Sequence, residues 1–394
     1  MKILVYRYNS IFEPDVIEAF KSFGVEVDEE TTEITNKALS PSSRIDLVSK
    51  RILKASDSKN PYLFVFSINF YPEISAICTT LHTRYVCWSV DCPVLELFSN
   101  EIKNEYNRVF LFDRLQYERL HKYNENGLFH LPLASGTERM DKVISTISNA
   151  DRAKFSADIS FVGSLYSEKN KYRELKGLSD FTKGYVDGLV SAQLMIYGVN
   201  FIESSLTDAV VEDMKKGRIG SDSQNLVEPV DRFAAAHEFI GYEIAERERQ
   251  LTLSTLSEYF DVNLYTLSDT SKLPKVNNKG SARSLDEMPK IFNLSKINLN
   301  MTMRSIQTGL PLRIFDIVSA GGFCMTNYQE ELPELFDIGV DLEAYSSLEE
   351  LVDKCSYYLS HEDERKRIAL NGYEKAKTVH NIRNRVAQMI KNVE

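Results

Sequence analysis

The sequence predicts an α/β protein with two doubly wound halves and a helical insertion in the second. Strand-like apolar runs alternate with amphipathic helical segments over the first 140 residues, and this alternation returns after about residue 260. Such alternation favours parallel sheets that helices cover on both faces. The length agrees, because 394 residues exceed one ordinary domain of ~150 residues.

The first half, residues 1–140, is expected to form one Rossmann-like domain. The apolar residues of segment 13–23 recur at helical spacing, and Gly24 is suited to end that helix. The run 62–66 is continuously apolar, as in a strand covered on both faces. The expected strands are residues 2–7, 25–27, 62–66, 84–88, 108–112 and 127–131, and the expected helices are 13–23, 44–55, 74–81 and a segment that ends at His121.

The second half is expected to begin after a polar connection over residues 141–157. A strand over Asp158–Val162 runs into a Gly-Ser turn and opens a second Rossmann-like domain, residues 158–378. Residues 168–259 have helical periodicity, interrupted by a polar break at 217–224, and are predicted to be an insertion. Strands are then expected at 262–266, 297–303 and 323–326, with helices at 288–294, 312–320 and from 347 onward. Residues 379–394 are predicted to form a helix that packs back on the first domain.

Charge and cysteine content restrict the partners and the compartment. Lys and Arg total 47 against 57 Asp and Glu, so the net charge is −10 and no nucleic acid partner is expected. The five cysteines contain no Cys-x-x-Cys pair and are expected to be buried free thiols of a reducing compartment. The first apolar run is broken by Arg7, and no run reaches ~18 apolar residues. We therefore expect a cytoplasmic protein with at most peripheral membrane contact.

Several familiar motifs are absent. Tyr8-Asn9-Ser10 follows the first strand where a dinucleotide-binding domain would have Gly-x-Gly-x-x-Gly, so a nicotinamide oxidoreductase is disfavoured. The sequence also lacks a P-loop, a His-Glu-x-x-His metal motif and a Gly-x-Ser-x-Gly elbow. Neither a metal site nor a cofactor is predicted.

The most informative segment is residues 295–327. A strand ends in a polar loop, and Pro311 stands close to the start of the next helix. The amino end of a helix at the carboxyl edge of a parallel sheet is suited to bind an anion. Arg304 and Arg313 would neutralise a diphosphate, and Asp316 would accept two hydrogen bonds from a ribose diol. The alternative is an Arg313–Asp316 pair, three residues apart, that only anchors the helix.

This segment resembles the nucleotide-binding segment of group 1 retaining-type glycosyltransferases, most closely their CgeB-like branch. The resemblance rests on Ser-x-x-x-Gly-x-Pro-x-Arg-x-Phe-Asp at residues 305–316, on Ala320-Gly321-Gly322, and on the strand that ends at Asn327. The first half contributes matching segments at residues 66–70, 88–93 and 111–113, and the hinge strand at residues 161–166 matches as well. The resemblance implies the GT-B architecture, in which two Rossmann-like domains face a cleft and the second binds a nucleotide-diphosphate sugar without a metal.

The resemblance also assigns donor-binding residues. In that family two glutamates eight positions apart mark the helix; Asp316 stands at the second, ribose-binding position and Thr308 at the first. Ser164 replaces the arginine that usually follows the glycine of the hinge strand, whereas Lys169 keeps a lysine position. The predicted donor-binding residues are Gly163, Ser164, Lys169, Arg304, Gly309, Arg313 and Asp316.

The acceptor side is expected at the strand ends of the first domain. Asp91 follows a buried strand and is the candidate base that an inverting enzyme requires, with a plain turn role as the alternative. Asn9, Ser67 and Asn69 follow other strands and are expected either to line the acceptor side or to cap loops. Arg247 and Arg249 are assigned to a solvated Glu-Arg-Glu-Arg face, with contact to the donor phosphates as the less favoured alternative.

The predicted function is transfer of a sugar from a UDP-sugar or GDP-sugar to a protein or a cell-surface glycan. The alternative is a non-catalytic nucleotide- or sugar-binding protein on a degenerate scaffold, which the departures at Thr308 and Ser164 allow. Retention or inversion of configuration is left open.

Overall fold

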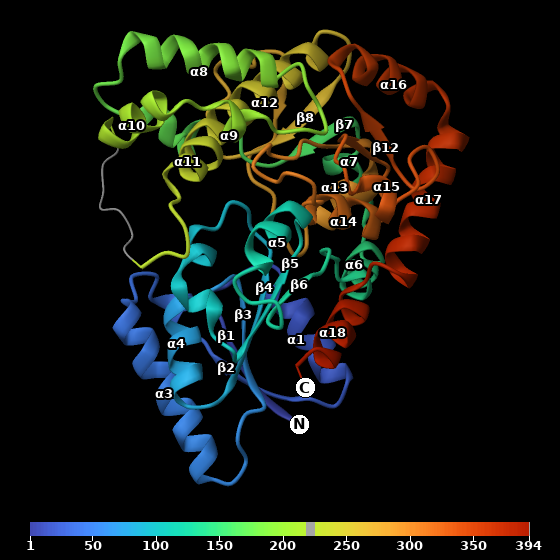
Figure 1. Ribbon diagram of the computed structural model, residues 1–394. Helices are drawn as coiled ribbons and strands as arrows, with labels where there is room; N and C mark the ends of the chain where they lie inside the picture. Colours follow the sequence, from blue (N-terminus) through green and yellow to red (C-terminus); the bar gives the residue numbers. More distant parts are fainter. Residues whose placement is uncertain (218–224, 394) are drawn as a thin grey trace. The chain divides into compact units, whose positions relative to one another are not determined.

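A computed structural model of the protein describes residues 1–217 and 225–393, so the polar break predicted at 217–224 lies outside the described residues except for Gly217. Within the described residues the strands form two six-stranded sheets, and every pairing in both is parallel. Each sheet belongs to a separate compact unit (Figure 1). The prediction of two doubly wound α/β halves is confirmed.

Unit 1 comprises residues 1–135, 225–229 and 380–393, and its sheet has the order β2-β1-β3-β4-β5-β6. Its strands are β1 (Lys2–Tyr6), β2 (Glu26–Glu30), β3 (Phe64–Ile68), β4 (Arg84–Ser89), β5 (Asn107–Leu111) and β6 (Leu128–His130). Its helices are α1 (Glu13–Ser22), α2 (Thr32–Thr35), α3 (Pro41–Asp57), α4 (Pro72–Thr80), α5 (Arg114–His121) and α18 (Ile382–Lys391), with 3₁₀ turns η1 (Leu95–Phe98) and η2 (Asn100–Lys103). All five residues of β3 are buried, as expected for a central strand with helices on both faces.

Two later segments of the chain complete unit 1. Helix α18 packs against α1, and the Arg108 Nε donates to the carbonyl of Asn392 at 3.0 Å. Residues 225–229 lie along η1 and α5, where the Arg119 guanidinium and the Tyr123 hydroxyl both bind the carboxylate of Glu228 at 2.7 Å. Unit 1 is therefore assembled from three separate stretches of sequence.

Unit 2 comprises residues 136–217 and 230–379, and its sheet has the order β12-β11-β10-β7-β8-β9. Its strands are β7 (Ala157–Val162), β8 (Val262–Tyr265), β9 (Asn277–Asn278), β10 (Ser295–Asn300), β11 (Cys324–Asn327) and β12 (Glu343–Tyr345). The helices that follow β8 are α13 (Met288–Leu294), α14 (Leu312–Ser319), α15 (Leu332–Leu335), α16 (Leu348–Ser360) and α17 (Glu362–Thr378).

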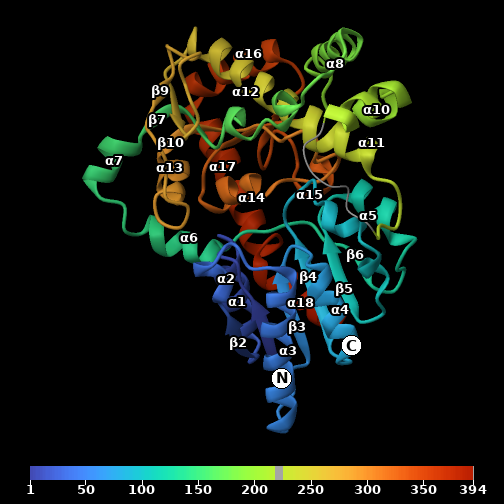
Figure 2. The ribbon, with the colours of Figure 1, turned by 90° about the vertical axis from the view of Figure 1, so that its left-hand side faces the viewer.

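Helices fill the region between β7 and β8, where the insertion was predicted. They are η3 (Ser167–Lys169), η4 (Lys171–Glu174), α8 (Asp180–Gln193), α9 (Ile202–Ser205), α10 (Asp208–Gly217), α11 (Asp231–Phe233), the π-helix η5 (Ala234–Ile240) and α12 (Gly241–Ser257). Helices α8, α10 and α11 lie together in both views (Figures 1 and 2). An apolar core joins α8, α10 and α12, which contribute Val186, Val210 and Ile244. The adjoining sheet has a core of its own.

The segment predicted as a connection, residues 141–157, is not an extended linker. It contains the end of α6 (Thr137–Ile144) and all of α7 (Asn149–Phe155), and both helices belong to unit 2. Ser148 and Asp151 form a capping box at α7, and Lys290 on α13 pairs with Asp151 at 3.0 Å. The polar residues of this segment therefore belong to capped helices with exposed faces.

In the described part of the chain, none of the five cysteines is in a disulfide; Cys92 is partly exposed and the others are buried. None of the described helices has the length and apolar content needed to cross a bilayer.

Candidate functional site

The carboxyl ends of β7 and β10 lie side by side in the sheet of unit 2, because Phe161 pairs with Leu299 in parallel register. Residues 163–164 follow β7, and the loop 301–311 follows β10 and leads into α14. Ligands of open α/β sheets bind at carboxyl strand ends. A ligand site of unit 2 is therefore expected at this edge.

Polar side chains at the carboxyl end of β11 and just after it hold the loop 301–311. The Thr302 amide donates to Asn327 Oδ1 at 2.8 Å, and Gln329 Nε2 donates to the carbonyl of Gly309 at 3.2 Å. Among the described residues, the N-cap position of α14 is Pro311, whose side chain makes no capping hydrogen bond. The helix thus presents its positive dipole end from a fixed loop, as an anion site requires.

Arg313 and Asp316 form the predicted pair on α14, with 3.2 Å between Arg313 Nη1 and Asp316 Oδ2. The Arg313 guanidinium also lies over the ring of Phe292, 5.3 Å from its centroid. The Arg313 side chain remains 24% exposed, whereas that of Asp316 is 8% exposed. The ion pair that the alternative interpretation required is present, and it leaves part of Arg313 accessible.

Arg249 on α12 reaches the same edge, contrary to the prediction that it belongs to a solvated face. It is 8% exposed. Its guanidinium donates to the carbonyl of Ser164 after β7 and, at 2.9 Å, to the carbonyl of Met301 after β10. The ring of Tyr166 lies 4.2 Å from the guanidinium carbon. Arg249 therefore joins the ends of the two central strands.

These two arginines give the site a positive charge that the described residues do not balance. Arg249 forms no ion pair with any carboxylate among them. Burial lowers the pKa of Arg313; the Asp316 carboxylate acts to raise that pKa, and the positive charge of Arg249 lowers it further. Of these two guanidinium groups, only that of Arg313 is paired with a described carboxylate, that of Asp316. Buried charge is costly without a partner, so this excess favours a bound anion.

Arg304, which was predicted to neutralise a diphosphate, has a structural role instead. It is 3% exposed, and its Nη2 lies 2.7 Å from Glu248 Oε1. Its guanidinium also stacks over Tyr197, 4.3 Å from the ring centroid. A buried carboxylate already neutralises Arg304, whereas Arg249 lies at the strand ends without an ion-pair partner among the described carboxylates.

The turn after β7 shows why Gly163 and Ser164 stand there. A Cβ atom on Gly163 would lie 3.1 Å from the ring of Phe161, so a side chain would crowd that ring, and it would be in ordinary contact with Arg249 Nη1 at 3.7 Å. The Ser164 hydroxyl accepts from the Tyr166 amide and donates to Glu168, both at 2.7 Å. These bonds support the left-handed backbone of Tyr166, whose φ is 66°. Ser164 contributes its carbonyl to Arg249.

The remaining predicted donor residues differ in placement. Lys169 is exposed on η3. Gly309 is buried in the loop before α14. The Thr308 hydroxyl donates to Glu331 Oε1 at 2.7 Å, and Glu331 is 1% exposed. A carboxylate from the segment after β11 thus lies behind Thr308, and no spacing in the sequence pointed to it.

In unit 1, Asp91 and Asn69 form one hydrogen-bonded group at the carboxyl ends of β4 and β3. The Asn69 amide nitrogen donates to Asp91 Oδ2 at 2.6 Å, and its oxygen accepts from the backbone of Val90 at 3.0 Å. Asn69 is left-handed, with φ of 59°, and Asp91 is exposed. The Asp91 carboxylate is therefore oriented by a neighbour and open to solvent.

The two other predicted acceptor-side residues have different environments. Asn9 follows β1, is exposed and has a left-handed φ of 76°. Ser67 is fully buried; its hydroxyl bonds to the Tyr85 hydroxyl at 2.6 Å and to the carbonyl of Asn69 at 2.7 Å. Ser67 is too buried to line a binding surface, so the structure favours the other interpretation, that it caps a loop. It holds the turn that carries Asn69.

Among residues 1–217 and 225–393, no cluster of three or more His, Cys, Asp or Glu side chains is arranged to bind a metal ion.

The architecture is that of the GT-B glycosyltransferases. A glycosyltransferase from Rickettsia africae superimposes over 100% of this chain and 97% of its own, with a TM-score of 0.55 and 11% identity. Anabaena HepE, solved in complex with UDP, superimposes over 99% of each chain, with a TM-score of 0.52 and 11% identity. T4 phage BGT, solved in complex with UDP-glucose, superimposes over 100% of each chain, with a TM-score of 0.51 and 9% identity. Identities this low show the fold alone.

The sequence itself matches a family model described as glycosyl transferase-like, over residues 247–391. This match includes Arg249, Arg313 and Asp316, so the candidate site in unit 2 lies within it. No curated protein matches the chain. The resemblance to the CgeB-like branch stays a prediction.

Proposed function

We propose that this protein is a glycosyltransferase that uses a nucleoside-diphosphate sugar as donor. The observation that carries the proposal is the unbalanced positive charge of Arg249 and Arg313 beside the uncapped end of α14. A diphosphate would supply the missing negative charge and accept hydrogen bonds from the helix amides. The glycosyl transferase-like family match over the same residues supports this assignment.

Asp316 is the proposed ligand of the ribose. A carboxylate on the second turn of α14 is suited to accept hydrogen bonds from a diol whose phosphates lie at the start of that helix. HepE and T4 phage BGT were solved with UDP or UDP-glucose, which favours a uridine donor over a guanosine donor.

The proposed reaction breaks the bond between the sugar C1 and the diphosphate oxygen. Negative charge develops on the departing diphosphate, where guanidinium groups and helix amides stabilise it. Asp91 removes the proton of the acceptor hydroxyl as that oxygen bonds to C1. A base in this role requires inversion of configuration at C1. Asn69 orients Asp91 by donating to one of its oxygens.

The proposed chemistry needs neither a cofactor nor a metal, because Arg249 and Arg313 replace a divalent cation at the leaving group. T4 phage BGT was solved with UDP and Mn²⁺, so this point needs its own test. We expect EDTA to leave the transfer rate unchanged and added Mn²⁺ not to raise it. A metal-dependent rate would contradict the role given to the arginines.

Titration calorimetry with UDP, GDP and their sugars tests the donor assignment. We expect UDP to bind more tightly than GDP and much more tightly than uridine. Absence of binding by any nucleoside diphosphate would sink the proposal. The rival is a non-catalytic nucleotide- or sugar-binding protein, which Thr308 allows because it lacks the carboxylate of the family pattern. Release of UDP from a UDP-sugar separates the two, since the rival binds without turnover.

A further inference from the structure

A second group of aromatic and charged side chains lies at the carboxyl end of β1 and β3 in unit 1. Tyr8 follows β1, and Tyr71 stands just before α4. Their ring centroids are 6.4 Å apart and both rings are partly exposed. Tyr6 lies beneath Tyr71, with 5.2 Å between centroids in an edge-to-face arrangement. These rings are not used in the donor site.

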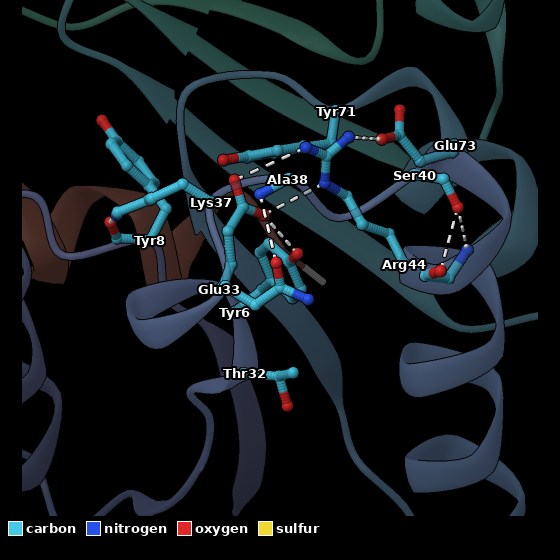
Figure 3. Close-up of polar contacts among 12 residues, drawn as sticks. Tyr6, Tyr8, Thr32, Glu33, Lys37, Ala38, Ser40, Arg44, Tyr71 and Glu73 are labelled. Atoms are coloured by element: carbon cyan, nitrogen blue, oxygen red, sulfur yellow. Dashed lines mark hydrogen bonds and ion pairs between the residues drawn. The ribbon is translucent and has the colours of Figure 1, made fainter.

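An ion network fixes this group (Figure 3). Arg44 on α3 lies between two carboxylates, with its Nε 3.0 Å from Glu33 Oε2 and its Nη1 2.6 Å from Glu73 Oε1. The Tyr6 hydroxyl donates to Glu33, and the Arg44 guanidinium carbon lies 5.2 Å from the Tyr71 ring centroid. Arg44 is therefore neutralised by these two carboxylates. The network holds Tyr71 in place and leaves no cationic site there.

Lys37 fixes the other ring. This exposed side chain donates to the carbonyl of Tyr8, and its ammonium nitrogen lies 5.9 Å from the Tyr8 ring centroid. Figure 3 shows Lys37 between Tyr8 and the Arg44 network. The segment that carries Lys37 is thereby kept beside the rings. The two tyrosines form a preformed surface.

One amide connects this surface to Asp91. The Asn69 Nδ2 atom that donates to Asp91 also donates to the Tyr8 hydroxyl at 3.2 Å. Burial and the charge of Asp91 raise the pKa of Tyr8, and burial and the charge of Glu33 raise that of Tyr71. Both phenols therefore stay neutral and keep their hydrogen-bond donors.

We infer that Tyr8, Tyr71 and Asn69 form an acceptor subsite for a saccharide, so that the acceptor is a glycan and not a protein side chain. A pyranose has an apolar face of C–H groups and a rim of hydroxyls. An aromatic surface edged by an amide and a carboxylate is complementary to both features. A sugar ring lying on Tyr8 places a hydroxyl near Asp91, because both side chains bind the same amide nitrogen. This role rests on the glycosyltransferase function proposed above.

Saturation-transfer NMR tests the inference, with methyl glycosides of glucose, galactose, mannose and N-acetylglucosamine, and with maltose and cellobiose, each in the presence of UDP. We expect at least one saccharide to receive saturation from the wild-type protein. Tyr8→Ala should weaken the binding of that saccharide about tenfold, because one aromatic contact is lost. Tyr8→Phe, which keeps the ring, should retain the signal. Tyr259→Ala, which removes a 67% exposed tyrosine of unit 2, is the matched control.

The outcomes separate the inference from the function on which it rests. If neither UDP nor GDP binds the wild type, the proposed function fails, whatever the saccharides do. If UDP binds but no saccharide does, or if Tyr8→Ala binds the saccharide as the wild type does, the subsite is wrong. Transfer of the donor sugar to a serine- and threonine-rich peptide, and to none of the saccharides, would also overturn the inference. A thermal melt of Tyr8→Ala shows whether a lost signal reflects unfolding.

Discussion

Replacing two arginines of unit 2, one at a time, separates donor binding from stability. Arg249→Met removes a buried cation that no described carboxylate neutralises, so it leaves no buried acid unpaired. Two hydrogen bonds to backbone carbonyls are lost, about 1.5–3 kcal/mol each. Relief from burying an unpaired charge offsets much of this loss. We expect the free energy of unfolding to fall by no more than about 2 kcal/mol.

The same change should have a large effect on UDP binding. Removing one partner of a buried, hydrogen-bonded charge pair costs about 2–5 kcal/mol, so we expect UDP to bind about 100-fold more weakly. Uridine has no phosphate and should bind equally to the wild type and to Arg249→Met. Arg249→Lys should be intermediate, because a lysine keeps the charge but cannot reach both carbonyls in a planar fork.

Arg304→Met is the contrasting change. It leaves Glu248 buried and unpaired, at a cost of about 3–5 kcal/mol of stability. The fraction that remains folded should bind UDP with near wild-type affinity. Urea denaturation and calorimetry with UDP and uridine measure both effects. Wild-type UDP affinity in Arg249→Met, or a specific loss of UDP affinity in folded Arg304→Met, would refute the assignment of the diphosphate cation.

Three further predictions concern single carboxylates. Asp316→Ala should weaken the binding of both uridine and UDP by about tenfold or more, because a charged ribose contact is lost. Wild-type affinities for both ligands in calorimetry would refute the ribose role. Asp91→Asn should lower the transfer rate by about 10²–10⁴ and leave UDP affinity unchanged, whereas an active variant would exclude Asp91 as the base. Burial acts to raise the pKa of Glu243, but hydrogen bonds from Asn170, Arg247 and Arg173 outweigh it and lower the pKa. The stability from Glu243 is therefore present above its unfolded pKa of about 4.3 and lost on acidification below it, so Glu243→Gln should flatten the acid limb of urea stability measured against pH.

The sheets could be predicted from the sequence because buried parallel strands are continuous apolar runs. The predicted strand boundaries differ from the observed ones where polar residues enter a strand. The strand predicted at 62–66 is observed at Phe64–Ile68, since Leu63 is exposed and Ser67 is accommodated by a hydrogen bond to Tyr85. The strand predicted at 25–27 extends to Glu30. It is an edge strand, where charged side chains are tolerated and protect against unwanted pairing.

The main error at the site concerned α12, whose Glu-Arg-Glu-Arg sequence is typical of a solvated helix. This helix contributes Ile244 to the apolar core of the helical region and Leu253 to the core of the sheet. Packed on two sides, it buries Glu248 and Arg249. Which arginine is neutralised and which is left for a ligand depends on tertiary neighbours more than 50 residues away in sequence, such as Arg304 and Met301. A single sequence does not reveal those neighbours.

The packing of α18 on α1 has a consequence for how the chain matures during synthesis. Helix α1 lies near the start of the sequence, and its partner emerges from the ribosome only after all of unit 2 has been translated. Val386 and Met389 of α18 are buried, so the surface that they cover stays exposed on a nascent unit 1. Domains generally fold as units during translation. Here the first domain to be started is the last to be finished, and a fragment that stops at residue 379 should expose an apolar patch that chaperones can bind.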